Sequence, residues 1–507
     1  MGARAAIVRG LGKLASALEK RAEQKRSSAK RAYSAAVNNR LTSDWKRSDT
    51  TADMEVKTAL KILRMSARDL ERNNDYVRRY FNLLVENVIG HKGIGLQIRA
   101  TGGDGRQDLR ANDIIEDRWR KWGRSCTVCG RYTWIDVQKL ALRAMARDGE
   151  ILIYMPPAWR KNEAGFALQL IEADHLDLDL NIDLRNGSRI IMGVEMDEFR
   201  RPVAYHVLAK HPADTVAHAL AKYRRRLPAE DVIHLHAPER VDETRSAPWI
   251  CSVANRLRHI SGAEEAEVVA WRVAASKMGF YIPGDDSEYD GDDEDDDGAP
   301  IQEAEPGLFE KLKRGWDFKE WNPDKPASTV QSFLKAELRG VSSGLNVSYH
   351  SLGNDLEGVN FSSIRAGELH DRSTWRSIQQ FLVEHLHQVV FERWLTAALT
   401  TGFVPLPPGK YDKFNAAVWR PRGWEWVNPA DESEAAQNDV ANCTKSLYDV
   451  AAERGVDLDE VIELNKQAKE KAEAAGLIIP AFVPKDQNNG KSAQKSKPRE
   501  TEPVGNV

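Results

Sequence analysis

Residues 322–402 constrain the fold of this chain more than any other stretch, because they encode two long helices joined by a loop. Pro323 and Pro326 restrict the backbone to extended conformations, and Ser328 or Thr329 is placed to cap the first helix. Apolar residues then recur on one helical face, namely Val330, Phe333, Leu334, Leu338 and Val341. This spacing predicts a helix over residues 329–341.

A loop rich in Gly and Asn separates this helix from the next one. Gly344 is placed to end the first helix, and Ser362 or Ser363 can begin the second. The apolar residues of the second helix also recur at helical spacing. They are Leu369, Ile378, Leu382, Leu386, Val389 and Leu395.

The loop carries a distinctive order of residues. This order begins with Leu338-Arg339 in the first predicted helix and continues over residues 344–367 as GLNVSYHSLGNDLEGVNFSSIRAG. This order closely resembles the central signature of the lambda-type portal proteins of tailed bacteriophages, in which an LR pair, a GLGVSY-like turn, an acidic D and an NYSS-x-R element follow one another. Phe361 stands where Tyr is usual, and the acidic residue is spaced slightly differently. The matching residues are Leu338, Arg339, Gly344, Leu345, Val347, Ser348, Tyr349, Asp355, Asn360, Phe361, Ser362, Ser363 and Arg365.

The resemblance extends from about residue 41 to about residue 480 and implies an α+β subunit built like a portal. Such a subunit has a mixed α/β wing, two long stem-type helices, a small α/β clip and a helical C-terminal region. The implied parts of this chain are a wing (51–246), a first stem-type helix (247–278), a clip-like projection (279–327), further stem or tunnel-type helices (328–402) and a C-terminal strand with crown-like helices (403–485). Composition adds three parts to this division: a basic, largely mobile arm (1–50), an acidic loop (285–297) for which the family pattern has no counterpart, and a disordered tail (486–507).

The wing region begins with helical patterns and ends with short strands. Asp53 can cap a first helix, and Asn74 and Asp75 end it and begin a second, which stops at Gly90. A further helix is predicted over residues 137–147. Short apolar or alternating runs then predict strands at 151–155, 166–170, 190–194, 203–208 and 232–235. Near the C-terminus, helices are expected over residues 434–454 and 458–475.

A thin apolar stripe over residues 248–278 predicts one long helix, which would span about 45 Å at 1.5 Å per residue. Leu257 and Ile260 lie on this stripe. A helix so long and so thinly apolar needs neighbours, and other copies of the chain are the simplest source. We therefore expect Leu257 and Ile260 at a subunit contact, with the helix packed against residues 329–341 or 363–400.

The overall charge argues against a tight nucleic-acid binder. The 507 residues carry a net charge of -3, whereas affinity for nucleic acid comes from phosphate neutralisation by Lys and Arg. The sequence has no membrane-spanning apolar run and no secretory signal, so we expect a soluble, cytoplasmic product. Residues 1–50, however, hold twelve Lys and Arg against four acids. This arm could bind nucleic acid or a membrane surface, or it could be a mobile basic arm.

Two groups of potential metal ligands deserve separate treatment. Cys126 and Cys129 form a C-x-x-C that could be half a zinc site or a redox pair, but a tight turn before Gly130 is the favoured interpretation because two further zinc ligands are missing. His234 and His236 alternate on a predicted strand without a third ligand. We therefore predict no metal at either place. The scattered cysteines are expected to be reduced thiols.

Ten acids occur within the thirteen residues 285–297. The spacing does not fit a calcium-binding EF-hand, and self-repulsion predicts a solvated loop. By family resemblance this loop belongs to the end of the ring where other proteins dock. Asp292, Asp293, Glu294 and Asp295 are therefore candidates for docking a basic partner, although a surface insertion without a role remains open.

The resemblance implies a phage portal protein. Such a protein forms a ring, in this case expected to be a dodecamer, at one capsid vertex of the virion after assembly in the host cytoplasm. Double-stranded DNA passes through it during packaging and ejection, and the terminase large subunit, head-completion and tail connector proteins and the major capsid protein contact it. The sequence contains no convincing catalytic motif, so no enzyme activity and no cofactor are predicted. The alternative is a DNA-binding or scaffolding structural protein acting through the basic arm.

Overall fold

The computed structural model describes residues 40, 48–185, 187–214, 223–275, 279–282, 317–320, 327–357, 360–424, 429–456 and 458–476. The chain divides into two compact units, Met1–Glu55 and Val56–Val507. The described strands and helices belong to the second unit, apart from the first turn of α2 (Ala52–Asn73). Nearly all of the basic arm, the acidic run 285–297 and the C-terminal tail lie outside the described residues.

The first two helices break where the sequence predicts. Helix α2 ends at Asn73, and α3 (Asp75–Leu84) begins after Asn74, whose side chain accepts a hydrogen bond from Val77 N at 3.1 Å. Helix α3 continues into a π-helical turn, η2 (Val85–Ile89), which ends at Gly90 with a positive φ of 71°. The predicted cap at Asp53 is wrong, because α2 already begins at Ala52.

The next helices flank the C-x-x-C segment. Helix α4 spans Leu109–Gly123 and α5 spans Trp134–Asp148. Helix α5 begins three residues earlier than predicted, because Thr133 and Asp136 form a capping box. The turn between the helices is confirmed: Gly130 has a φ of 70° and its backbone N donates to Thr127 O at 3.0 Å.

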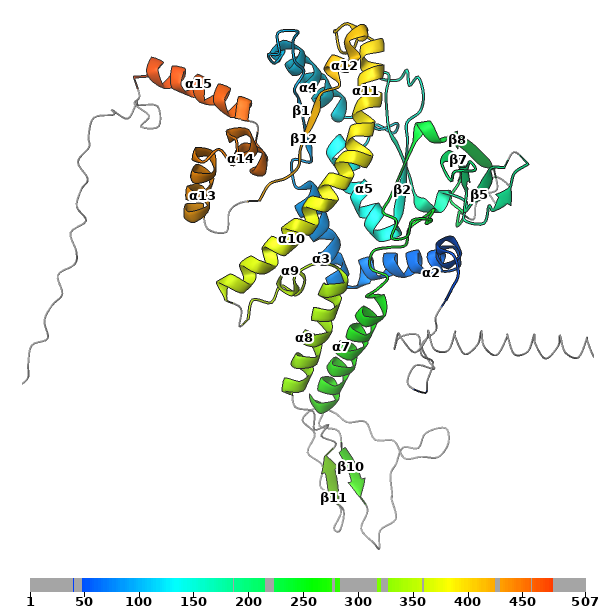
Figure 1. Ribbon diagram of the computed structural model, residues 1–507. Coiled ribbons are helices and arrows are strands. Elements are labelled where there is room, and N and C mark those ends of the chain that lie inside the picture. Colours follow the sequence, from blue (N-terminus) through cyan, green and yellow to red (C-terminus); the bar gives the residue numbers. More distant parts are fainter. Residues whose placement is uncertain are drawn as a thin grey trace, which may run out of the picture. The chain divides into compact units, whose positions relative to one another are not determined.

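Two antiparallel sheets form most of the β structure (Figure 1). The first has the order β3-β2-β9, with β2 at Glu150–Tyr154, β3 at Gln169–Ile171 and β9 at Val232–His236. The second, which we call the β-lobe, has the order β4-β5-β6-β7-β8. Its strands are β4 (Ile182–Asp183), β5 (Arg189–Ile191), β6 (Val194–Met196), β7 (Pro202–Leu208) and β8 (Arg224–Pro228).

One strand prediction is wrong. Residues 190–194 do not form a single strand, because Met192 and Gly193 have positive φ values of 47° and 85° and turn the chain between β5 and β6. The other predicted runs correspond to β2, β3, β7 and β9 with shifted ends. A separate pair, β1 (Gly95–Ile98) and β12 (Ala417–Arg420), joins segments that are far apart in the sequence.

Helices α7 (Ala254–Ala275) and α8 (Ala327–Gly344) pack side by side (Figure 1). Helix α7 is shorter than predicted at its beginning, because residues 249–253 form turns. Helix α8 begins before both predicted capping residues, Ser328 and Thr329, which lie in its first turn. Between these two helices in the sequence, β10 (Gly279–Ile282) pairs antiparallel with β11 (Asp317–Glu320).

The remaining helices follow the signature. They are α9 (Tyr349–Gly353), α10 (Phe361–Leu382), the π-helical turn η6 (Val383–His387), α11 (Gln388–Thr400), α12 (Tyr411–Phe414), α13 (Pro429–Ala441), α14 (Leu447–Glu453) and α15 (Leu458–Ala474). The predicted single helix 434–454 is wrong. Cys443 adopts a φ of 57° after α13, and Ser446 with Asp449 forms a capping box that begins α14. Together these elements confirm the predicted α+β class.

An aromatic cluster lies at the centre of the main core. The ring of Trp119 lies 4.8 Å from Trp122, 5.6 Å from Trp134 and 5.0 Å from Trp394, centre to centre. The buried His387 contacts the same cluster, 5.3 Å from the Trp134 ring. Burial lowers the pKa of His387 to about 4, although its hydrogen bond to Leu382 O acts in the opposite direction. The cluster joins α4, α5, η6 and α11.

His387 makes the stability of this core depend on pH. Above about pH 6.5 the side chain is neutral in both the folded and the unfolded chain. Between about pH 6.5 and about pH 4, only the unfolded chain takes up the proton, so the free energy of unfolding falls as the pH is lowered. The pKa difference corresponds to a loss on the order of 3 kcal/mol.

We predict that His387→Gln, which keeps a hydrogen-bond donor but does not titrate, reduces this loss. Urea unfolding at about pH 7 and about pH 4.5 measures the difference for each variant. The exposed His370 of α10 provides the control, since His370→Gln is expected to leave the pH dependence unchanged. Equal pH dependence in wild type and His387→Gln would show that this histidine does not set the acid sensitivity.

Candidate functional site

The portal signature forms the end of α8, α9 and the start of α10 (Figure 1). Leu338, Leu345 and Val347 are buried in the main core. Arg339 points outward, and its guanidinium carbon lies 5.6 Å from the centre of the Tyr349 ring. These residues therefore hold the segment together.

The acidic residue of the signature connects α8 to the loop after α9. The Tyr349 hydroxyl donates to Asp355 Oδ2 at 2.7 Å, and Lys335 Nζ lies 3.3 Å from the same oxygen. The hydrogen bonds from Tyr349 and from the Glu357 backbone, with the nearby Lys335 charge, lower the pKa of Asp355 to about 2. Asp355 is therefore ionised at neutral pH.

A second carboxylate, which the sequence did not reveal, holds α9 against α10. Asp371 is fully buried and accepts hydrogen bonds from Ser348 N at 2.7 Å, Ser348 Oγ at 2.8 Å and Ser351 Oγ at 2.9 Å. The Ser348 side chain also caps α9 by accepting from Ser351 N. The SYHS portion of the signature is thus positioned by a residue that lies 23 positions after Ser348 in the sequence.

The start of α10 differs from the prediction. Asn360 is its N-cap and accepts from Ser363 N at 2.8 Å, so neither Ser362 nor Ser363 begins the helix. An Asn side chain at this position satisfies a free backbone N–H of the first turn. Arg365 lies one turn later and is half-buried. The Phe361 side chain lies outside the described part of the structure.

Two glycines let α7 approach α8 closely. An added Cβ at Gly344 would lie 2.4 Å from Val253 Cγ1, and one at Gly340 would collide with the Arg256 guanidinium. Arg256 Nε also lies 3.2 Å from Glu337 Oε2. Gly344 is the last residue of α8, as predicted. The sequence did not predict that it also leaves room for the close approach of Val253.

The predicted subunit-contact residues prove to be core residues. Leu257 and Ile260 have no exposed surface in the single chain, because they belong to the main hydrophobic core at the N-terminal end of α7. Their assignment to a subunit contact is therefore wrong. The other predicted docking residues, Asp292 to Asp295, lie outside the described part of the chain.

A buried charge cluster joins α2 to both sheets. Glu150 of β2 is fully buried and accepts from Arg245 Nε at 2.7 Å, Arg64 Nη2 at 2.5 Å and His234 Nε2 at 2.7 Å. Burial alone would raise the pKa of Glu150, but the charges of Arg245 and Arg64 and the His234 hydrogen bond hold it well below its ordinary value. Glu150 is therefore an ionised carboxylate within the protein interior.

Arg245 extends this cluster into the β-lobe. Its guanidinium donates to the backbone oxygens of Ala173, Leu176 and Met192 at 2.8, 3.0 and 3.1 Å. These carbonyls lie before and within the β-lobe, whereas Glu150 lies on the neighbouring sheet. One arginine thus connects the two sheets through four acceptor groups.

The candidate metal ligands do not form a recognisable site. The His234 and His236 rings stack at 4.3 Å, and burial together with the His234 charge lowers the pKa of His236 to about 3. Burial raises the pKa of Cys126 to about 12, whereas Cys129 is exposed. No group of three or more potential metal ligands occurs among the described residues. Within the same residues, no helix combines the length and apolar character that a membrane span requires.

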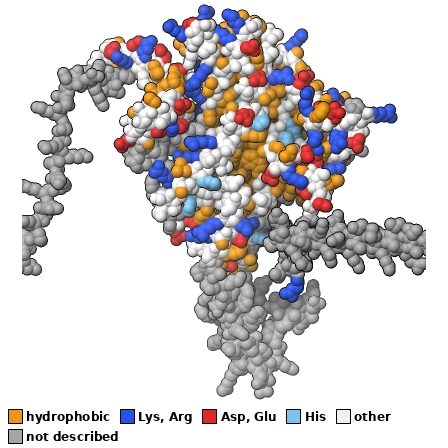
Figure 2. All heavy atoms as spheres, viewed as in Figure 1, with side chains coloured by type: hydrophobic (Ala, Val, Ile, Leu, Met, Phe, Trp, Pro, Cys, Tyr) orange, Lys and Arg blue, Asp and Glu red, His pale blue; other side chains and the backbone are white. Residues whose placement is uncertain are grey.

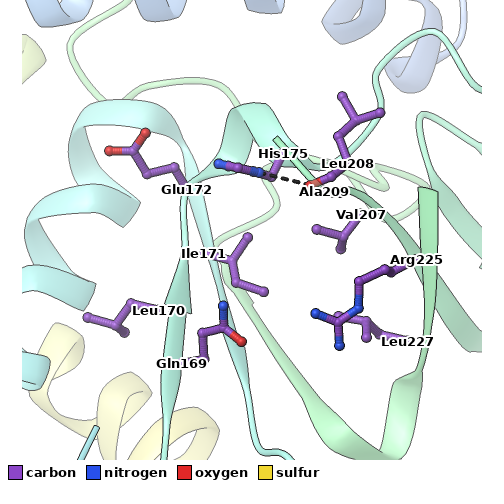
Figure 3. Close-up of a pocket in the computed structure, with 10 residues that line it drawn as sticks. All are labelled: Gln169, Leu170, Ile171, Glu172, His175, Val207, Leu208, Ala209, Arg225 and Leu227. Atoms are coloured by element: carbon purple, nitrogen blue, oxygen red, sulfur yellow. Dashed lines mark hydrogen bonds between the residues drawn. The ribbon is translucent and has the colours of Figure 1, made fainter. Parts of the chain in front are cut away.

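A cavity of about 300 Å³ lies between the two sheets (Figure 3). Ile171 of β3 lies on one side, and Val207 of β7 with Arg225 and Leu227 of β8 lies on the other. His175 donates from Nδ1 to Leu208 O at 3.0 Å at one end. The lining side chains contain no recognisable catalytic set, so the cavity is a candidate binding site only.

The comparisons with known proteins agree with the signature. The family model described as phage portal protein, lambda family, matches residues 38–379. The chain belongs to this family. It is 34% identical to a probable portal protein of Halomonas phage phiHAP-1, over 85% of each chain. It is also 20% identical to portal protein B of Escherichia phage lambda, over 82% of this chain and 85% of that one. The predicted family resemblance is confirmed.

Two solved particle structures contain chains similar to this portal-family protein. One is the neck of an empty GTA particle, with 13% identity, coverage of 79% of this chain and 94% of that chain, and a TM-score of 0.46. The other is the virion of a native gene transfer agent particle, with 11% identity, the same coverages and a TM-score of 0.45. Because both TM-scores are below 0.5, family membership rests on the sequence comparisons.

We predict that Glu150→Gln destabilises the subunit by about 3–5 kcal/mol, because two buried arginines lose their carboxylate. Urea unfolding measures the change. The exposed pair between Glu163 and Lys121, at 2.7 Å, provides a matched control. Glu163→Gln is expected to leave the unfolding free energy nearly unchanged, because an exposed ion pair contributes little to stability. Equal effects of the two substitutions would contradict the proposed role of the buried cluster.

Proposed function

We propose that this portal-family chain forms a ring at one vertex of a phage capsid, with a structural rather than a catalytic role. Double-stranded DNA would pass through the ring during packaging and ejection. The terminase large subunit and the head-completion or tail connector proteins would dock on it, and the major capsid protein would surround it. Family membership carries this proposal, and a dodecamer is the expected assembly.

The surface of the α7–α8 pair supports assembly with other copies. Away from the core, α7 exposes Val268, Val269 and Trp271, and α8 exposes Phe333. The exposed fractions are 49% for each valine, 67% for Trp271 and 45% for Phe333. Apolar side chains gathered on one exposed helix pair are typical of an interaction site. Neighbouring subunits would cover them in a ring.

The charge of the chain suits a conduit for DNA. Each phosphate contact retained by the channel would have to be broken as the DNA moves, so strong basic attraction would hinder translocation. The net charge is -3, and Figure 2 shows Lys, Arg, Asp and Glu side chains interspersed over one face of the molecule. This distribution favours a passage over a tight binding surface.

We predict that the double substitution Val268→Glu and Trp271→Glu prevents ring formation, since burying each carboxylate would cost several kcal/mol. Negative-stain imaging and sedimentation of the purified protein measure the assembly. Leu447→Glu, at an exposed apolar residue of α14, is the control and should still form rings.

Normal rings from the double variant would show that this part of α7 is not a subunit contact. Wild-type protein that remains monomeric and binds DNA with a steep salt dependence would instead support the alternative, a DNA-binding protein acting through the basic arm.

The acidic run 285–297 is proposed to attract a basic partner. Ten carboxylates per chain, repeated around a ring, would create a negative field that extends about 10 Å at 0.1 M salt. Electrostatic complementarity mainly raises association rates. Asp292, Asp293, Glu294 and Asp295 form the longest uninterrupted part of this field together with the two aspartates that follow.

Deleting residues 285–297 is predicted to leave the ring intact and to slow the docking of the terminase or connector, most strongly at low salt. Stopped-flow association at two salt concentrations measures the effect. A replacement by Gly and Ser of the same length controls for loop length and should behave like the deletion. Docking rates that do not change at any salt concentration would indicate a surface insertion without this role.

A further inference from the structure

The β6–β7 hairpin presents an exposed aromatic side chain. Phe199 at its tip is 82% exposed, and the neighbouring Glu198 is also exposed. A phenylalanine buries about 150–250 Å² when it is covered, so leaving it in water is costly. Phe199 is therefore a candidate contact with another protein surface.

Hydrogen bonds hold this hairpin tip in one conformation. The Asp197 carboxylate accepts from Phe199 N at 3.0 Å and from Arg201 N at 2.8 Å. Arg200 then donates from Nη2 to the backbone oxygen of Asp242 at 2.6 Å, which attaches the tip to the loop before Arg245. A side chain presented by a rigid loop loses little conformational entropy on binding.

A cavity lies at the other end of β7, the strand that follows the hairpin tip. Phe199 precedes β7, whereas Val207 and Leu208, the last residues of β7, line the cavity between the β-lobe and β3. The cavity volume of about 300 Å³ is at the lower limit of ligand pockets, about 300–1,000 Å³, and leaves room for an aromatic ring. The seven residues of β7 separate the two features by about 20 Å, so Phe199 does not reach the cavity of its own subunit.

We propose that Phe199 of one subunit inserts into the cavity between β3 and β8 of the next subunit. This contact joins different surfaces of identical chains, which is the kind of interface that generates a closed ring. The inference rests on the proposed ring and assigns one of its subunit contacts to the β-lobe. It is separate from the contact proposed for α7.

The charges near Phe199 and in the cavity support a second copy of the chain as the occupant of the cavity. Glu198 lies beside Phe199, and Arg225 lines the cavity on the side of β8 (Figure 3). The acidic residue of the lining, Glu172, lies on the other side, after β3. In the proposed contact, Glu198 would lie close to Arg225 of the next subunit, and the two would pair. Arg225 already lies 5.7 Å from the centre of the Tyr154 ring, and an inserted phenylalanine gives it a second aromatic partner.

The first experiment removes the aromatic ring. Phe199→Ser should raise the protein concentration needed for half-maximal ring formation by at least about tenfold, as expected for an interface residue that carries much of the binding energy. Ile182→Ser is the matched control, since Ile182 is an exposed apolar residue of β4 in the same lobe, and it should assemble like wild type. Mass photometry over a dilution series measures the ring fraction. Circular dichroism checks that each subunit remains folded.

The second experiment tests the charge pair. Glu198→Arg alone and Arg225→Glu alone should each weaken assembly, and the double variant carrying both should recover it at least partly. Recovery identifies an interaction between the two positions, because damage to separate surfaces would accumulate in the double variant.

The outcomes separate this inference from the proposed function. If wild-type protein forms rings and Phe199→Ser forms them equally well at every concentration, the inserted phenylalanine is ruled out but the portal ring is not. If the double charge variant assembles no better than the weaker single variant, the Glu198–Arg225 pairing is wrong. Wild-type protein that never forms rings overturns the proposed function itself.

Discussion

One buried carboxylate links α2, the two main sheets and the loop before α7. Glu150 is enclosed by Arg245, Arg64 and His234, which come from the loop before α7, from α2 and from β9. Removing charges from water costs several kcal/mol per ion, and only close partners on every side offset that cost. The cluster therefore tolerates little movement of these segments. The adjacent Gly149 reinforces this, because an added Cβ would lie 2.0 Å from Ser246 O.

This fixed centre explains the positions of the surfaces proposed to contact other copies. Helix α7 begins just after the segment that Arg245 anchors, so one face of its first turns is buried and its later residues extend away from the core. The β-lobe is attached through the carbonyls that Arg245 contacts, and the hairpin tip is attached through Arg200 to the same loop. Both exposed surfaces are thus held by one anchored loop, residues 239–246. A ring needs such rigidity, because every subunit must present the same angle to its neighbour.

The sequence predicted those features that depend on near neighbours in the chain. The break at Asn74 and the turn at Gly130 each follow from the local preferences of one residue. It did not predict features that depend on distant partners. Glu150 and Arg245 are 95 positions apart, and nothing in local spacing shows that a carboxylate in an apolar strand will meet a guanidinium. Leu257 and Ile260 were misassigned for the same reason: an apolar stripe shows that a helix face is covered, but not whether its own subunit or another copy covers it.

The portal signature therefore reports the internal geometry of one subunit. Many of its described side chains fill the core, cap α9 and α10 or bind Asp355 and Asp371, so they preserve the geometry of a loop between two helices. Such residues identify a fold family because few alternatives fit the same internal contacts. The residues proposed to meet other subunits, Phe199 and Trp271, lie outside the signature on exposed surfaces where the internal packing of one subunit imposes no choice. Recognition of the family and recognition of its contacts consequently depend on different residues, and only the former could be derived from the sequence alone.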